Sequence, residues 1–201
     1  MKSLIRILLF CILTSNVNAT TLPNIPIEEL FKKADVVALV DIKKGETIDI
    51  EGGSCGAVYE GTVAEAFKGV KKDGVVIFGP YHGYKIGYKY LLFLYNAENL
   101  FEPISSTNSI SEAARQEYLK KCQSKLKGLR IMHSGYGALK IEFTGKYKYK
   151  DAAIIPKRYV SFSQTLPKKK VAEGKCDEWE ECYWVPEDRL IKYLNKLKNE
   201  L

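Results

Sequence analysis

The strongest strand signals in the chain are two apolar runs, DVVALVDI at residues 35–42 and YKYLLFLY at residues 88–95. Both are rich in β-branched or aromatic residues, and in the first run apolar side chains fall on both faces of an extended strand. Gly45 is expected to end the first run, and Gly87 leads into the second. The first run therefore predicts a buried strand, and the second is the most strand-like segment of the chain.

Shorter strand signals surround these runs. They lie at residues 57–67, 75–78, 129–132, 138–143 and 152–155. Asp73-Gly74 predicts a turn into the 75–78 run, and Gly135-Tyr136-Gly137 predicts a hairpin between the two runs that flank it.

Helix signals lie at both ends of the chain and at one internal position. Pro26 is followed by acids and then by lysines, which suits the dipole of a short helix over residues 27–33. Residues from Ser111 to about Lys127 predict an inserted helix with Gly128 as its stop. From Pro186 onward, leucines and Ile191 recur at three- and four-residue steps, which predicts an amphipathic C-terminal helix.

This order of elements predicts a mainly β fold with flanking helices. Six or seven strands with helices at the ends suggest a small barrel that is closed to remove its sheet edges. We expect the helices to pack outside this barrel, with one helix inserted between strands and one at the C-terminus. No Pro-rich or Gly/Ser-rich linker divides the chain, so one domain is expected after the leader.

The first residues are typical of a secretory leader. Lys2 and Arg6 precede an apolar run, and Val17-Asn18-Ala19 provides the small residues that signal peptidase requires. We therefore expect a signal peptide at residues 1–19, cleavage after Ala19, and a mature chain that is secreted or periplasmic. No apolar segment reaches the length of about 20 residues that a membrane-spanning helix needs.

The charge of the chain is moderately basic. Loss of Lys2 and Arg6 with the leader lowers the formal net charge from +7 to +5. This excess permits attraction to an anionic surface but is spread along the chain, so it does not indicate nucleic acid.

Four cysteines remain after the leader: Cys55, Cys122, Cys176 and Cys182. In an oxidising compartment they predict two disulfides, for which three pairings exist. The close spacing of Cys176 and Cys182 suits a local bridge, which leaves Cys55 for Cys122. A metal site is the rival interpretation, but neither the cysteines nor the two histidines have zinc-ligand spacing. No motif calls for a cofactor.

Three segments between residues 31 and 95 carry a family resemblance. They are Phe31-x-x-Ala34-Asp35-Val36-Val37, Tyr59-x-Gly61-Thr62-Val63 leading into Phe67-Lys68-Gly69, and Gly87-Tyr88-Lys89-Tyr90-Leu91-Leu92-Phe93-Leu94. The series resembles the netrin-like domain, the family that includes the tissue inhibitors of metalloproteinases. This resemblance implies that residues 20–201 form one secreted, disulfide-bonded domain with a C-terminal extension. Its implied fold is an OB-like, closed five-stranded barrel with an inserted helix and a C-terminal helix.

The N-terminus departs from that family. In the metalloproteinase inhibitors the mature chain begins with a cysteine that chelates the catalytic zinc, whereas this chain is expected to begin at Thr20. A fold does not carry a function without its site. Protease inhibition is therefore an alternative rather than the preferred function.

One pattern has the form of a hydrolase motif. Residues 52–56, Gly-Gly-Ser-Cys-Gly, satisfy Gly-x-Ser-x-Gly with Ser54 as the nucleophile. That motif needs a strand before the serine and a helix after it. Since residues 57–67 predict a strand, a serine hydrolase is a disfavoured alternative.

Aromatic and basic residues gather in the loop at residues 81–85 and recur further along the chain, and together they form a candidate ligand surface. Its members are Tyr81, His82, Tyr84, Lys85, Tyr147, Tyr149 and Arg158. OB barrels stack nucleic-acid bases on such rings, but tyrosines at alternate strand positions are more often packing residues, and export removes the usual nucleic-acid partner. The sequence therefore favours a non-enzymatic binding module whose partner is a protein or an anionic surface, and it does not set the oligomeric state.

Overall fold

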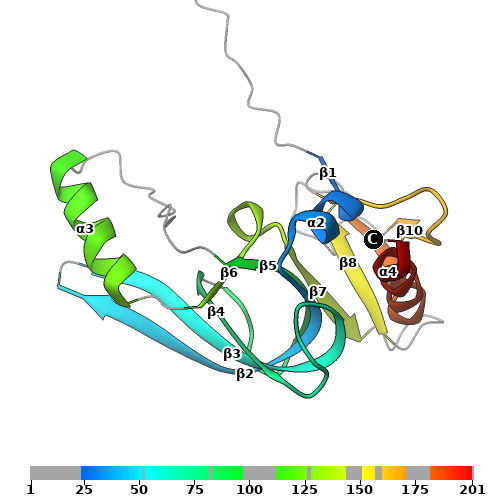
Figure 1. The fold of residues 1–201 in the computed structure, drawn as a ribbon, viewed down its shortest axis with the longest axis horizontal. Coiled ribbons are helices and arrows are strands. Elements are labelled where there is room, and N and C mark those ends of the chain that lie inside the picture. The colour runs from blue at the N-terminus through cyan, green and yellow to red at the C-terminus, as the bar shows by residue number, and fades with distance from the viewer. Residues whose placement is uncertain are drawn as a thin grey trace, which may run out of the picture.

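The computed structural model describes residues 24–51, 53–81, 83–96, 112–125, 128–143, 151–156, 160–170 and 182–200. Strands dominate this part of the chain, and α4 forms its C-terminal end (Figure 1). The helices are α2 (Ile27–Lys33), α3 (Glu112–Lys125) and α4 (Glu187–Glu200), with a 3-10 turn η1 (His133–Gly135). The mainly β class and the C-terminal helix are confirmed. The expected leader at residues 1–19 lies outside the described residues.

Eleven strands occur among the described residues. They are β1 (Ile25–Pro26), β2 (Val36–Ile50), β3 (Gly53–Lys68), β4 (Val75–Tyr81), β5 (Lys89–Asn96), β6 (Leu129–Ile131), β7 (Ala138–Phe143), β8 (Asp151–Pro156), β9 (Val160–Ser161), β10 (Lys169–Lys170) and β11 (Cys182–Pro186).

Five of these strands close into a ring. The order β5-β2-β3-β4 places the fourth strand beside the first, which is the Greek-key arrangement. β6 then completes the ring, because it pairs with β4 in parallel at Phe78 and Leu129 and with β5 in antiparallel. β2 and β3 have partners on both sides within this order, and closure by β6 gives β4 and β5 a partner on their other side.

The sheet continues beyond the ring through β7, β8, β11 and β10. The predicted hairpin between β6 and β7 is wrong: the two strands lie one after the other along the same edge of β5. The reason lies in the backbone of Phe93. Its N–H donates to the carbonyl of Gly137 at 2.7 Å, and its carbonyl accepts from the N–H of Met132 at 3.0 Å. These bonds hold the connecting turn against β5 instead of folding β7 back onto β6.

β2 and β5 separate two apolar cores, which explains their continuous apolar runs. Alternate residues face the interior of the ring, among them Val40, Tyr90 and Leu92. The residues between them, such as Leu39 and Leu91, face a second core that α2 and α4 cover. All five side chains are buried. The predicted burial of residues 35–42 on both faces is confirmed, and β5 is buried in the same way.

Beyond the ring, β2 and β3 continue together as a two-stranded arm, with α3 beside its tip (Figure 1). The expected end of the strand at Gly45 is wrong, since β2 runs on to Ile50. Gly45 pairs with Tyr59, and a Cβ at Gly45 would lie 3.1 Å from the ring of Tyr59. The glycine therefore makes room for a neighbouring ring within the strand and does not stop it.

Candidate functional site

Five aromatic side chains pack together in the core enclosed by the five strands and at its edge. Tyr84 is at their centre: its ring centroid lies 5.1 Å from Tyr90, 5.3 Å from Tyr59, 5.9 Å from Phe78 and 6.1 Å from Tyr81. All four contacts are edge to face, the geometry that aromatic quadrupoles favour. Tyr84 thus anchors the segment between β4 and β5 to the core.

Two tyrosines of the predicted ligand surface are packing residues in the structure. The hydroxyl of Tyr81 donates to the carbonyl of Ile131 at 2.8 Å. Burial raises the pKa of Tyr81 to about 12 and also raises the pKa of Tyr84. Both phenols are therefore neutral at ordinary pH, and their half-buried rings pack edge to face against neighbouring rings.

Lys85 lies on the solvent side of the same segment, near Tyr88. Tyr88 is 40% exposed, and two ammonium groups lie over its ring, Lys140 Nζ at 4.5 Å and Lys85 Nζ at 5.7 Å from the centroid. Lys140 also pairs with the carboxylate of Glu142. Cation–π contacts at exposed sites contribute about 0.5–1 kcal/mol each, so this cluster is a small basic and aromatic surface feature.

The remaining members of the predicted ligand surface lie outside the described residues. They are His82, Tyr147, Tyr149 and Arg158. The structure therefore brings together Tyr81, Tyr84 and Lys85 and places one of these three, Lys85, in solvent.

A surface that the sequence analysis missed lies on the outer side of β3 and β4. Val75 is 63% exposed and Ile77 is 46% exposed. The alternating residues of the same strand, Val76 and Phe78, are buried and face the interior of the strand ring. Val75 pairs with Thr62 of β3, and Ile77 pairs with Glu60. We call these four outward residues, Val75, Ile77, Thr62 and Glu60, the β3–β4 face.

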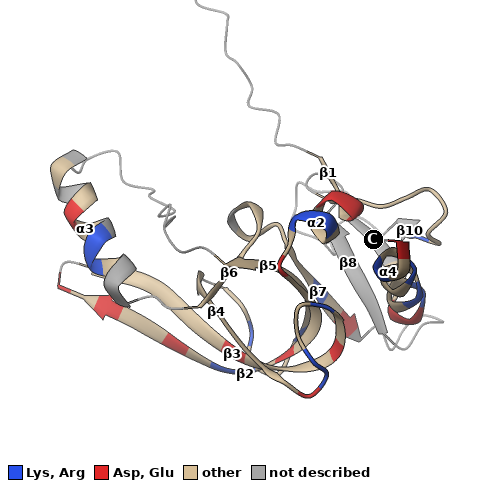
Figure 2. Ribbon diagram, in the orientation of Figure 1, with Lys and Arg blue, Asp and Glu red and all other residues tan. Residues whose placement is uncertain are grey.

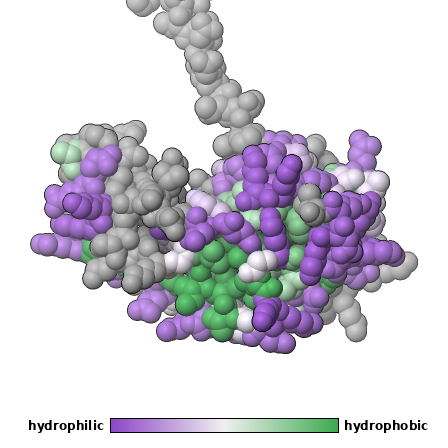
Figure 3. All heavy atoms as spheres, in the orientation of Figure 1, coloured by the Kyte–Doolittle hydropathy of each residue, from purple (hydrophilic) through white to green (hydrophobic). Residues whose placement is uncertain are grey.

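Hydrophobic residues gather over this part of the fold in the space-filling view (Figure 3). Contiguous apolar area on a protein surface commonly marks an interaction site. The sequence signal for this surface is the unbroken run of four apolar residues at the start of β4. In the structure one face of this run is buried, and no described element covers the other.

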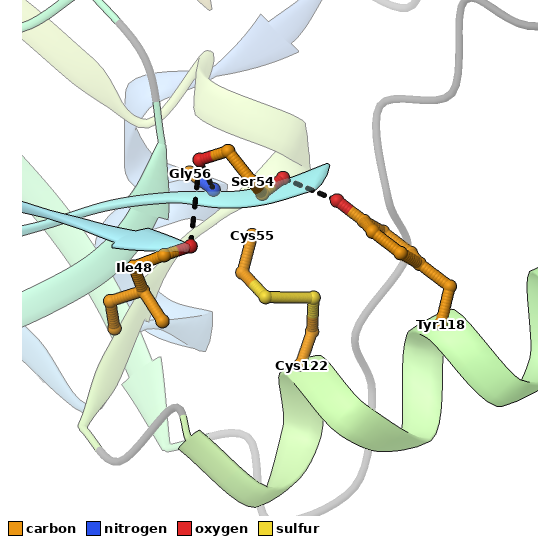
Figure 4. The surroundings of a disulfide bond; sticks show 6 residues. All are labelled: Ile48, Ser54, Cys55, Gly56, Tyr118 and Cys122. Carbon is orange, nitrogen blue, oxygen red and sulfur yellow. Dashed lines mark hydrogen bonds between the residues drawn. A yellow bond between two sulfur atoms is a disulfide. The ribbon is translucent and has the colours of Figure 1, made fainter. Parts of the chain in front are cut away.

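The tip of the arm holds a disulfide. Cys55 of β3 and Cys122 of α3 are bonded, with an S–S distance of 2.07 Å and a Cα–Cα distance of 5.5 Å (Figure 4). The hydroxyl of Tyr118 donates to the carbonyl of Ser54 beside it. The predicted Cys55–Cys122 pairing is confirmed. Cys176 lies outside the described residues, so the second bridge, to Cys182 of β11, stays a prediction.

Ser54 does not have the geometry of a nucleophile elbow. It lies within β3, and strand rather than helix follows it. Its Oγ lies 3.5 Å from the carbonyl of Ile48 and accepts from the N–H of Gly56 at 3.2 Å (Figure 4). These contacts hold the hydroxyl against the backbone of the arm.

Two further findings concern the described part of the chain. No group of three or more His, Cys, Asp or Glu residues in it is placed to hold a metal ion. None of its helices is both long enough and apolar enough to cross a membrane.

No family model, curated protein or solved structure matches the chain.

Proposed function

We propose that the mature chain is an exported, non-enzymatic binding module of the OB type that binds a protein partner through the β3–β4 face. The five-stranded Greek-key ring supports the OB assignment, and so does the netrin-like pattern of core residues between residues 31 and 95. In OB folds the outer face of the second and third strands is a preferred ligand surface. Counted within the ring, those strands are β3 and β4.

The exposure of Val75 and Ile77 carries this proposal. Two β-branched aliphatic side chains lie side by side on one face, and their exposure to water is unfavourable. A partner that covers them gains about 25 cal/mol of binding free energy per Å² of apolar area buried. The neighbouring Thr62 and Glu60 supply a polar border. An apolar centre with a polar rim is the anatomy of a protein–protein contact.

The same surface argues against a nucleic acid. Binding of single strands needs aromatic rings for base stacking and a basic groove along the backbone. The exposed large side chains of the β3–β4 face are aliphatic, and its charged residue is the acidic Glu60. Tyr81 and Tyr84 are occupied by core packing. A protein with an apolar contact surface is the partner that fits.

A site-specific photo-cross-linker tests the proposal in the native host. The cross-linker replaces Ile77 in one variant and Lys32 in the control, because Lys32 is exposed on α2, which covers the other core. We expect a discrete protein adduct from position 77 that position 32 does not give. Identical adduct patterns from the two positions, or adducts with polysaccharide or nucleic acid alone, would refute the proposed surface. A protease in the adduct would assign the partner to the inhibitor class.

A further inference from the structure

A groove lies between α4 and the turn that leads to β10. Its volume is about 630 Å³, within the range of small-molecule sites. One wall is the turn that contains Thr165 and Leu166, and the other is the face of α4 that carries Arg189, Lys192 and Lys196. The three cations recur at three- and four-residue steps, so they share one side of the helix.

Positive charge dominates this groove. Glu200 is the acid among its lining residues. Glu200 pairs with Lys196 at 3.4 Å, and Arg189 pairs with Asp188 at 3.6 Å; all four side chains are more than half exposed. Surface pairs of this kind contribute little free energy, so a ligand can replace them. Figure 2 shows Lys and Arg bands along α4.

Both walls of the groove are fixed before any ligand arrives. Leu190, Leu194 and Leu197 bury the other side of α4 in the core. The hydroxyl of Tyr193 donates to the carboxylate of Glu28 on α2. In the turn, the N–H of Leu166 donates to the Ser163 carbonyl at 3.1 Å. Preorganised groups lose less entropy on binding than mobile ones do.

The other lining groups indicate which anion fits. Asn195, Asn199 and Thr165 offer amides and a hydroxyl, which hydrogen-bond to sugar hydroxyls, and the ring of Tyr193 offers an apolar face. The exposed large hydrophobic residues among those that the structure describes are Val75, Ile77, Ile86 and Tyr88, and none of them lines the groove. The groove therefore lacks an apolar wedge for a lipid bilayer.

We propose that this groove binds an acidic saccharide, with Arg189, Lys192 and Lys196 on its anionic groups and the two asparagines on its hydroxyls. The site shares no residue with the β3–β4 face.

The first test is a binding titration of the full mature chain with an oligogalacturonate at physiological ionic strength. A neutral maltooligosaccharide and phosphatidylglycerol vesicles serve as the other ligands. We expect the triple variant Arg189→Ala, Lys192→Ala, Lys196→Ala to bind the oligogalacturonate at least about tenfold more weakly. The matched control removes three exposed lysines elsewhere, Lys43, Lys44 and Lys71, and should keep its affinity within about twofold.

A second measurement needs no substitution. Amine acetylation of the wild-type chain, followed by mass spectrometry, should show Lys192 and Lys196 protected by the oligogalacturonate and Lys43 unprotected. Replacement of Asn195 and Asn199 by Ala should weaken binding of the oligogalacturonate but leave binding of inorganic polyphosphate unchanged.

Three outcomes would overturn the proposal: equal weakening in the two triple variants, binding to vesicles without binding to the saccharide, and the absence of protection at Lys192. None of them bears on cross-linking at Ile77, so the two proposals fail separately.

Discussion

Removal of the Cys55–Cys122 disulfide should lower stability in two distinguishable ways. The bridge closes a segment of 67 residues that contains β4, β5 and most of β3. In the chain-entropy model, release of a closure of this length stabilises the unfolded state by about 4 kcal/mol. The perturbation is the double variant Cys55→Ala, Cys122→Ala, and the expected change in the free energy of unfolding is of that size.

The second effect is local. α3 lies beside the arm rather than over either large core, and its described anchors there are the disulfide, the Tyr118–Ser54 hydrogen bond and contacts with Ile48 and Ile50. We therefore expect amides of α3 to exchange faster in the double variant at denaturant concentrations where β5 keeps its protection.

Urea unfolding followed by circular dichroism measures the first effect, and hydrogen exchange by mass spectrometry measures the second. The matched control is Tyr118→Phe, which removes one hydrogen bond, keeps the bridge and should cost about 1 kcal/mol. A loss below about 1 kcal/mol in the double variant would contradict the entropic reasoning. Simultaneous loss of protection in α3 and β5 would contradict the peripheral place of the helix.

Three further predictions concern the core and the turns. Tyr84→Ala removes the ring that contacts four others and should cost about 3 kcal/mol in urea unfolding, whereas Tyr84→Phe should cost under about 1 kcal/mol. Above pH 10, the free energy of unfolding should fall by up to about 1.4 kcal/mol per pH unit for each of Tyr81 and Tyr84, because the unfolded chain loses these protons first while burial raises the folded pKa of Tyr81 to about 12. Gly69→Ala should destabilise the fold more than Gly83→Ala does, since both glycines have positive φ but an added Cβ at Gly69 would lie 2.0 Å from the Asp35 carbonyl, whereas Gly83 has no heavy atom within 4 Å.

Each of these has its own contradicting result. Equal losses for Ala and Phe at position 84 would mean that the ring contacts contribute nothing. An unchanged alkaline slope in a Tyr81→Phe, Tyr84→Phe variant would assign the titration to other groups. Equal stabilities of the two glycine variants would remove the steric argument at Gly69.

The sequence predicted the two strands that separate the two cores. The apolar runs at residues 35–42 and 88–95 became β2 and β5, because both faces of these strands are buried in separate cores. The positions of α3 and α4 and the Cys55–Cys122 bridge also followed from local patterns. The hydrophobic period, the helix stops and the cysteine spacing can all be recognised in the sequence without knowledge of which segments meet in space.

Other features depend on which segments meet in space. Gly45 resembles a strand end in sequence, but its role is set by the ring of Tyr59 across the strand pair. The turn between β6 and β7 resembles a hairpin, but both strands pair with β5. Tertiary pairing overrides local turn chemistry at both places.

The candidate surface illustrates the same limit. Aromatic and basic residues in a loop suggested a ligand site at Tyr81 and Tyr84, yet edge-to-face contacts hold both rings against the core. The four apolar residues that open β4 gave no indication of which face is covered. Only the closed ring shows that Val75 and Ile77 point outward.

The most direct test of the proposed binding function is a titration with the partner that cross-links to position 77. Val75→Ser with Ile77→Ser should weaken this binding by about thirtyfold, since two aliphatic side chains then lose their burial at the contact. Ile86→Ser, which alters an exposed aliphatic side chain between β4 and β5, should leave the affinity unchanged. An affinity within about twofold of wild type for the double variant would contradict the role of the β3–β4 face.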